Sequence, residues 1–436
     1  MTSSVPVVMA EAPSARQVLR SRSVKGLLAL VALSNAGAIV QSVALGKFVF
    51  DTTGRELDLG LVGLAEFAPA ALLVLVTGHV ADKFDRRAIV RIALLGEAVV
   101  AGGLAWYVGT GPTAVGPIFA LSAAYGVARA FAAPASRAMY ADVVDADALP
   151  RLVAMTSVSW QASLIVAPVI SGFLYVGGVT WPFIAAVVFA LMAICATFII
   201  KVVLGRIGTT THEEPASLKT AMEGLKLIRR TPILLGAISL DLFAVLFGGA
   251  VALLPAIAED QLGVGAVGLG WLRAAAGIGA SAMAVTLAVR PIGHHVGRTL
   301  FLVVGIFGAA TIVLGVTHSF AIAFLSLVVL SAADAVSVFI RATLTPLVTP
   351  AGARGRVLAV ENVFIGASNE LGAFESGVAG QVLGVGPAVV FGGLMTLVVA
   401  FTWSVLFPSL RGVDRFEDAQ RSTEALNAEA RPVVAD

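Results

Sequence analysis

Residues 78–87 read GHVADKFDRR and place five charged side chains and a histidine within ten positions of an otherwise apolar chain. Of the 436 residues, 58% are hydrophobic and 13% are charged, whereas a soluble globular domain carries about 25% charged residues. Apolar runs of the roughly 20 residues needed to cross a bilayer recur between short polar breaks. The composition predicts a membrane protein with many spans, and residues 78–87 are one of its breaks.

The apolar runs predict an all-α membrane protein with twelve transmembrane helices. We expect these helices near residues 26–50, 57–80, 88–108, 115–140, 152–177, 180–202, 232–256, 265–290, 298–317, 320–346, 356–384 and 386–407. The longest break, 203–231, separates two six-helix halves, 26–202 and 232–407, with cytoplasmic segments at 1–25 and 408–436. Within this break, ASLKTAMEGLKLIRR has the pattern of an amphipathic helix on a membrane surface; a solvated linker is the alternative.

The basic residues predict the orientation. Most of the 29 Lys and Arg lie at the N-terminus, in the breaks after helices 2, 4, 6, 8 and 10, and in the C-terminal tail. The opposite breaks contain only Lys47 and Arg55. Because positive charge resists translocation, both termini of this multi-pass protein are predicted on the cytoplasmic side of the cell membrane.

Short sequence echoes relate the two halves to each other. The echoes are LGLVGL at 59–64 with VGLGWL at 267–272, RAFAAP at 129–134 with RATLTP at 341–346, and RLVA at 151–154 with RVLA at 356–359. Three echoes in the same order indicate two related halves, which is typical of transporters that rock around a central site.

The opening stretch carries a family resemblance. Gly78, Asp82, Arg86 and Arg87 resemble the G-x-x-x-D-[RK]-x-G-R-[RK] signature of the major facilitator superfamily, although Asp85 replaces its glycine. Helix number, orientation and repeat extend the resemblance over residues 24–408. ADKFDRR, with LGLVGLAEFAPA before it and LDLFAVLFGGAVALLP in the second half, is similar to the enterobactin-exporter-like and drug-efflux branch. The resemblance implies a major facilitator fold.

The resemblance also implies a cytoplasmic gate. In the family, the aspartate of the signature latches the two halves through the start of helix 11, which here is residues 354–357. Asp142, at the end of helix 4, is the expected partner of Arg86. The alternative is that these charges only enforce topology as a positive-inside loop.

Charges within the spans are the candidate functional groups, because one charge near a helix centre costs on the order of 3 kcal/mol. They are Glu66, Glu97, Arg129, Asp241, Arg273, Asp334, Arg341, Glu361, Glu370 and Glu375. The resemblance places helices 1, 4, 7 and 10 around the cavity, which singles out Arg129, Asp241, Asp334 and Arg341.

These candidates have two interpretations. Asp241 and Asp334 are expected near the membrane midplane, where a carboxylate can bind and release a proton, or they belong to structural ion pairs such as Asp334 with Arg341 or Arg129. Glu66 either contacts a cationic substrate or locks helix 2 to helix 11. Arg273 has Asp241 and Glu370 as possible partners.

Polar and aromatic residues complete the expected substrate cavity. We assign to it Asn35 and Gln41 of helix 1, Trp160 of helix 5, and Arg273. IVAPVISG at 165–172 is a degraded likeness of the family's antiporter motif, and helix packing is the preferred interpretation of its small residues.

Other chemistry is not indicated. No GxxxxGK[ST] loop for ATP is present, so transport is expected to use an ion gradient. The five histidines lack metal-ligand spacing, the single Cys195 excludes an internal disulfide, and the net charge of +2 does not indicate nucleic-acid binding. No cofactor, metal or enzymatic activity is predicted.

The sequence therefore predicts a secondary active, proton-coupled exporter of small amphipathic molecules, drugs or siderophore-like metabolites, that works by alternating access as a monomer in the lipid bilayer. An importer or a lipid carrier of the same fold is one alternative. A non-transporting membrane sensor is another.

Overall fold

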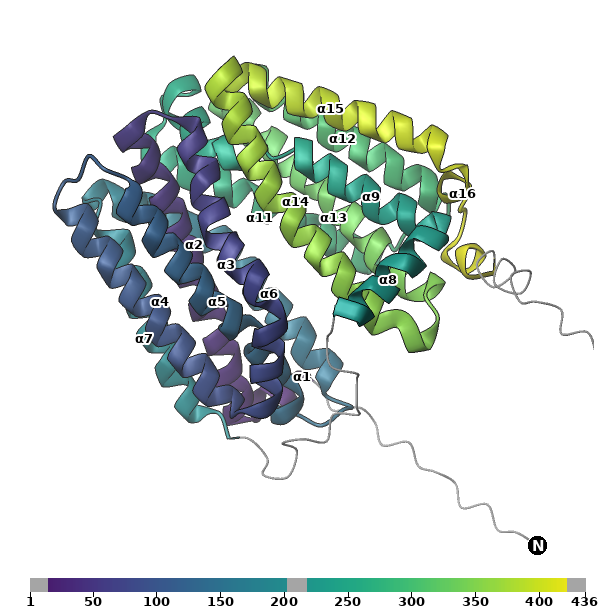
Figure 1. Cartoon of the computed structure of the whole chain (residues 1–436), viewed down its shortest axis with the longest axis horizontal. Coiled ribbons are helices and arrows are strands. Elements are labelled where there is room, and N and C mark those ends of the chain that lie inside the picture. The colour runs from purple at the N-terminus through teal and green to yellow at the C-terminus, as the bar shows by residue number, and fades with distance from the viewer. Residues whose placement is uncertain (1–14, 202–217, 422–436) are drawn as a thin grey trace, which may run out of the picture.

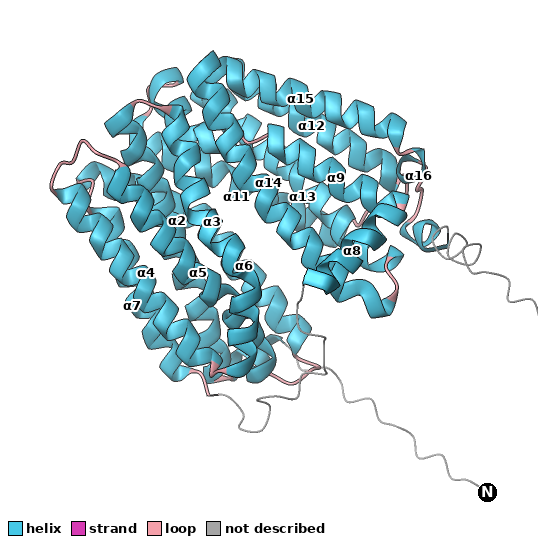
Figure 2. Ribbon diagram, viewed as in Figure 1, coloured by secondary structure: helices cyan, strands magenta, loops and turns pink. Residues whose placement is uncertain are grey.

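Every regular element of this protein is helical within residues 15–201 and 218–421, the ranges that the computed structural model describes (Figure 2). The first six long helices are α2 (Arg22–Thr53), α3 (Glu56–Lys83), α4 (Arg86–Gly109), α5 (Gly116–Val143), α6 (Leu149–Gly177) and α7 (Trp181–Ile199). The second six are α9 (Pro232–Phe247), α11 (Gly265–Val289), α12 (Val296–Val316), α13 (Phe320–Val348), α14 (Arg354–Leu383) and α15 (Val385–Leu406). The twelve predicted helices are all present.

Ten helices in the described ranges are long and apolar enough to cross a membrane, by length and composition. The other two of the twelve, α3 and α14, have 28 and 30 residues, so both exceed the length that a span needs. These two pack against each other across the junction of the two halves.

The seventh helix departs from the prediction of one continuous span over 232–256. It stops at Phe247 and continues as short 3-10, α and π segments from Ala250 to Gln261. The break lies at Gly248 and Gly249, where a Cβ on Gly249 would lie 2.6 Å from the carbonyl oxygen of Gly372. The backbones of this break and α14 therefore touch, and only residues without a side chain fit there.

Within the described ranges, three shorter α-helices and one 3-10 turn lie outside the spans: α1 (Ala15–Arg20), α8 (Leu218–Arg230), α16 (Pro408–Arg411) and the turn Ala351–Ala353. The helix predicted in the long break is α8. Ile228 is buried and Leu225 and Leu227 pack against the C-terminal core, whereas Met222 is exposed. The apolar face of α8 thus rests on α14 and α9; residues 203–217 of the predicted linker lie outside the described ranges.

The twelve spans form two groups, α2–α7 and α9–α15, which Figure 1 shows side by side. The groups meet mainly through two helix pairs, α3 with α14 and α6 with α11. The helices of each pair approach most closely at glycines. A Cβ on Gly60 would lie 2.8 Å from the Cα of Phe374, and a Cβ on Gly172 would lie 2.5 Å from the Ala266 carbonyl oxygen. Close backbone approach is how small residues join helices in membranes.

The two pairs touch toward one end of the bundle, which carries the loops after α2 and α6. We call it the outer end because the basic residues predict that these loops lie outside the cell. The other end, with α8 and the loops after α3 and α5, is the linker end. On α14, the stripe that contacts α3 at Gly377 and Glu370 continues to Val363, which is 52% exposed. On α6, the stripe that contacts α11 at Gly172 continues to Val158, which is 69% exposed. The halves are therefore closed at the outer end and separated at the linker end, as Figure 1 also shows.

Substituting Gly126 tests the close packing inside one half. A Cβ at Gly126 of α5 would lie 1.9 Å from the carbonyl oxygen of Glu66 on α3. We expect Gly126→Ala to destabilise the protein by about 1–3 kcal/mol through overpacking, lowering the midpoint of thermal unfolding in detergent. Gly305→Ala is the control, because nothing lies within 4 Å of a Cβ there; equal midpoints for the two variants would contradict the packing.

The loop before α12 is fastened to the C-terminal tail by Asp414. Its carboxylate accepts hydrogen bonds from the His295 backbone N–H at 3.0 Å and lies 3.2 Å from Nδ1 of His294. The Val296 N–H donates to the backbone carbonyl of Asp414 at 3.1 Å. The His294 contact and the His295 N–H hold the pKa of Asp414 below its usual value.

This fastening predicts a pH dependence. Because the pKa of Asp414 is lowered in the folded protein, its contact is complete at neutral pH and is lost as the pH falls through that pKa, below about 4. We expect Asp414→Asn to speed hydrogen exchange at Val296 and Gly297 several-fold at pH 7, but not below pH 4 after correction for intrinsic rates. Glu417→Gln should exchange like wild type, and a similar effect of both variants would argue against the contact.

Candidate functional site

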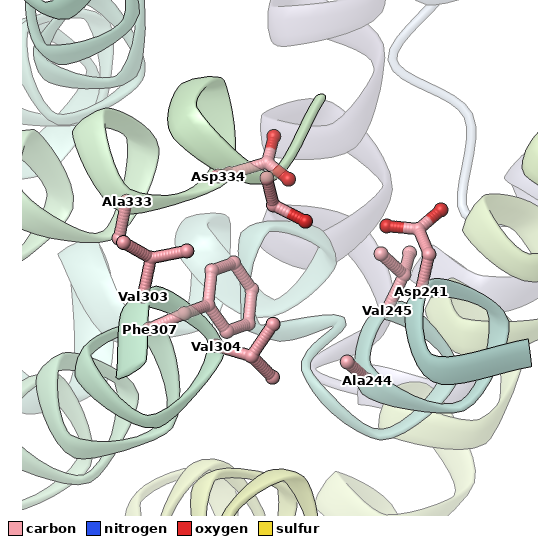
Figure 3. Close-up of a pocket in the computed structure, with 9 residues that line it drawn as sticks. Asp241, Ala244, Val245, Val303, Val304, Phe307, Ala333 and Asp334 are labelled. Carbon is pink, nitrogen blue, oxygen red and sulfur yellow. The ribbon is translucent and has the colours of Figure 1, made fainter. Parts of the chain in front are cut away.

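A buried ion pair lies inside the C-terminal half. Nη2 of Arg341 on α13 lies 2.7 Å from Oδ1 of Asp241 on α9, and the two residues are 4% and 7% exposed. Asp241 and Asp334 of α13 stand on two walls of a small cavity whose remaining wall includes Phe307 of α12 (Figure 3). The sequence analysis considered Asp334 as the partner of Arg341, but the structure pairs Arg341 with Asp241 instead.

More carboxylates than guanidinium groups surround this pair. Asp334 and Glu361 both interact electrostatically with Arg341, and Glu361 also accepts a hydrogen bond from Thr345 at 3.4 Å. Nε of Arg341 is buried without a hydrogen-bond partner. One arginine thus faces three carboxylates in the interior of this half.

A second charged group lies inside the N-terminal half around Arg129 of α5. Its Nη1 lies 3.4 Å from the hydroxyl of Tyr125, and its guanidinium lies 5.8 Å from the centre of that ring. Glu66 of α3 and Glu97 of α4 interact with Arg129 electrostatically. Among the described residues, neither forms an ion pair with it.

Glu66 also faces the other half. Oε2 of Glu370 on α14 lies 2.7 Å from where a Cβ of Gly63 would be, one turn before Glu66 on α3. Glu66 and Glu370 interact electrostatically. Of the two interpretations of Glu66, this placement fits a role at the junction of α3 and α14, the second and eleventh spans.

The residues expected in the substrate cavity are dispersed. Asn35 is half-buried on α2, Trp160 is 41% exposed on α6, and Arg273 is half-buried on α11. Gln41 is buried inside the N-terminal half, where it lines a small cavity with Glu97. Arg273 forms no ion pair among the described residues, so neither partner considered for it is found, and its Nε is buried without a hydrogen bond.

At the linker end, Arg86 pairs with Asp142, as expected. Nη1 of Arg86 donates to both carboxylate oxygens of Asp142 at 2.9 Å. Arg87 lies 3.6 Å from Asp85 and donates to the Ile200 carbonyl at 3.3 Å. This arrangement ties the signature to α5 and to the end of α7.

The other residues of the predicted gate, in the signature and at the start of α14, form no contact with each other that the structure describes. A Cβ added to Gly78 would have no neighbouring atom within 4 Å. The Asp82 side chain lies outside what the structure describes. At the start of α14, Arg356 donates from Nη1 to Glu223 of α8 at 2.6 Å. In this structure α8 therefore binds Arg356, the basic residue at the start of α14.

The sequence reasoning missed a charged cluster at the outer end. Lys47 of α2, which is 6% exposed, lies between Asp51 of the same helix and Oε2 of Glu259, the latter at 2.8 Å. The Tyr175 hydroxyl donates to Asp51 at 2.8 Å. Since Glu259 lies in the π segment at the end of the broken seventh helix, this Lys47 cluster joins the two halves. One feature of the sequence could have indicated this cluster: Lys47 is one of only two basic residues in the breaks at this end.

The Lys47 cluster predicts a shift between states. Glu259→Gln removes the only ion pair of the cluster that crosses the halves, and we expect it to weaken outer closure by about 1 kcal/mol, a roughly fivefold change in population. In a Cys195→Ser background, Ala373→Cys at the α3–α14 contact reports opening through its labelling by an impermeant maleimide in intact cells. Asp260→Asn is the control; equal labelling in both variants would contradict this role.

With the geometry established, comparison with known proteins assigns the family. Residues 27–367 match the family described as Major Facilitator Superfamily. The chain belongs to this superfamily. It is therefore a transporter and not an enzyme.

One curated relative is an uncharacterized MFS-type transporter, YfiS of Bacillus subtilis (strain 168). It is 24% identical over 306 residues, which cover 67% of this chain and 69% of the relative. Its name gives no substrate or direction of transport.

Solved structures show the same fold at low identity. A POT family transporter in complex with 5-aminolevulinic acid has a TM-score of 0.69 at 10% identity, covering 89% of this chain and 97% of its own. The xylose transporter XylE from E. coli, in an inward open conformation, has a TM-score of 0.67 at 15% identity, covering 95% and 100%. The nucleoside transporter NupG has a TM-score of 0.63 at 15% identity, covering 88% and 98%.

Proposed function

We propose that this transporter is a proton-coupled exporter of small amphipathic molecules, drugs or siderophore-like metabolites, that works by alternating access. The observation that carries the proposal is the Asp241–Arg341 ion pair, buried in the C-terminal half with Asp334 and Glu361 in electrostatic range. One guanidinium cannot neutralise three carboxylates, and uncompensated charge is costly in the membrane. A bound proton removes one negative charge.

The same cluster contains a means of coupling. When Asp241 is ionised, it holds Arg341 at 2.7 Å. When Asp241 takes up a proton, Arg341 is free to turn toward Asp334 or Glu361, which already lie in its field. Proton binding thereby changes the charge and side-chain arrangement of the cavity wall in Figure 3.

The contacts between the halves support alternating access. The closed outer end depends on glycine packing and the Lys47 cluster, whereas the linker end is open. In the opposite state, the Lys47–Glu259 pair separates and the signature at 78–87 meets the start of α14. Such an exchange of contacts between two packed arrangements is how rigid-body switching occurs.

The direction of transport and the class of substrate follow from the sequence resemblance. The stretch ADKFDRR and its flanking helices are similar to those of exporters of drugs and of enterobactin. An amphipathic molecule also suits an interior that combines apolar helix faces with a few charged groups. The resemblance therefore favours export over import.

Neutralising Asp241 tests the proposal. In inside-out vesicles, we expect a pH gradient to drive uptake of a fluorescent lipophilic dye by wild type, and Asp241→Asn to lose roughly tenfold or more of that uptake, because the group that exchanges the proton is gone. Glu375→Gln is the matched control, a carboxylate in a span but outside the Arg341 cluster.

Two other outcomes count against the proposal. Dye uptake that is indifferent to both the pH gradient and Asp241 would remove the proton assignment. No dye movement in any vesicle would exclude broad drug export and leave a dedicated metabolite or siderophore carrier.

A further inference from the structure

The N-terminal half has its own small cavity lined by a carboxylate. Glu97 of α4, Gln41 and Ser34 of α2, and Tyr125 of α5 line it together with alanines of α7. Glu97 is 6% exposed and Gln41 is 3% exposed. Among the described residues, the Glu97 carboxylate and the Gln41 amide have no hydrogen-bond or ion-pair partner.

The two cavities occupy related places in the two halves. The one in Figure 3 lies among the first, third and fourth helices of the C-terminal half, α9, α12 and α13. The other lies among the first, third and fourth helices of the N-terminal half, α2, α4 and α5, with α7 beside them. The echo of RAFAAP and RATLTP puts Arg129 and Arg341 at matching positions on the two fourth helices.

The two cavities differ in how their carboxylates are compensated. Asp241 has a guanidinium nitrogen at 2.7 Å. Arg129 instead bonds the Tyr125 hydroxyl at 3.4 Å and interacts with Glu97 only through the electrostatic field. A carboxylate that is buried, faces a cavity and lacks a partner is neutralised most cheaply by a proton.

We propose that Glu97 is a second proton-binding group of the transport cycle, placed in the N-terminal half, with the Gln41 amide as hydrogen-bond partner of the protonated carboxyl. The inference rests on the proposed proton-coupled function. The charged and titratable groups that face Glu97 are Arg129 and Tyr125 from α5 and Glu66 from α3. The α2 and α7 side chains that line the cavity are uncharged.

The position of Arg129 connects this site to the junction of the halves. When Glu97 is protonated, Arg129 stays with Tyr125 and Glu66. When Glu97 loses its proton, its full charge draws Arg129 toward α4 and leaves Glu66 less compensated. Glu66 then repels Glu370 of α14 across the α3–α14 contact, which favours separation of the halves at that contact.

The first test does not depend on transport. Infrared difference spectra of the full-length protein in lipid nanodiscs, recorded over a pH titration, should contain a protonated-carboxyl band that is lost in Glu97→Gln and retained in Asp241→Asn. Gln41→Ala should keep the band but shift its frequency, because the hydrogen bond to the carboxyl is removed. A Glu97→Gln spectrum that titrates like wild type would overturn the proposal. If Glu97→Gln does not fold, a Gln41→Ala band at the wild-type frequency would overturn it instead.

The second test uses vesicles and the same dye. We expect Glu97→Gln to lose roughly tenfold or more of uptake driven by a pH gradient, while dye exchange without a gradient stays within about threefold of wild type. Loss of both activities to the same extent would make Glu97 a structural residue and overturn the coupling role. If wild type moves no dye but the Glu97 band is present, broad drug export fails and the proton site stands.

Discussion

A charge in the apolar interior of a membrane must be compensated by another charge, a hydrogen bond or a proton, and the arrangement of this protein depends on how each half meets that requirement. Arg341 and Asp241 satisfy it on facing helices of the C-terminal half, at 2.7 Å. Arg129 satisfies it in the N-terminal half with the Tyr125 hydroxyl and the field of two glutamates. Because these two compensations lie within the halves, the halves can move against each other without breaking either of them.

The contacts between the halves have a different chemistry. They consist mainly of backbone against backbone, as at Gly60 with Phe374 and Gly172 with Ala266. Such contacts gain dispersion energy from close packing but contain no buried ion pair that must be broken at high cost. The charged exception is Lys47 with Glu259, whose carboxylate side chain is 45% exposed. Contacts of this kind suit the alternating access that we propose, in which the interface opens and closes repeatedly.

Two acidic groups meet where this interface ends. Glu66 and Glu370 belong to different halves, and Gly63 provides the space for the Glu370 carboxylate. Like charges so placed make the closed outer end sensitive to the protons and guanidinium groups nearby. At the linker end, Arg356 is held by Glu223, and in the proposed opposite state the start of α14 exchanges this partner for the signature at 78–87.

The sequence by itself determined the number of long helices, their division into two groups of six, the family and most of the buried charges, because apolar length, motifs and charge are properties of the chain alone. It also identified Arg86 and Asp142 as partners. It did not pair Arg341 with Asp241, did not place Gln41 beside Glu97, and missed the break at Gly248 and Gly249. Only the tertiary structure decided these, because helical periodicity fixes which side chains share a face, whereas the rotation of each helix and its crossing with its neighbours fix which faces meet.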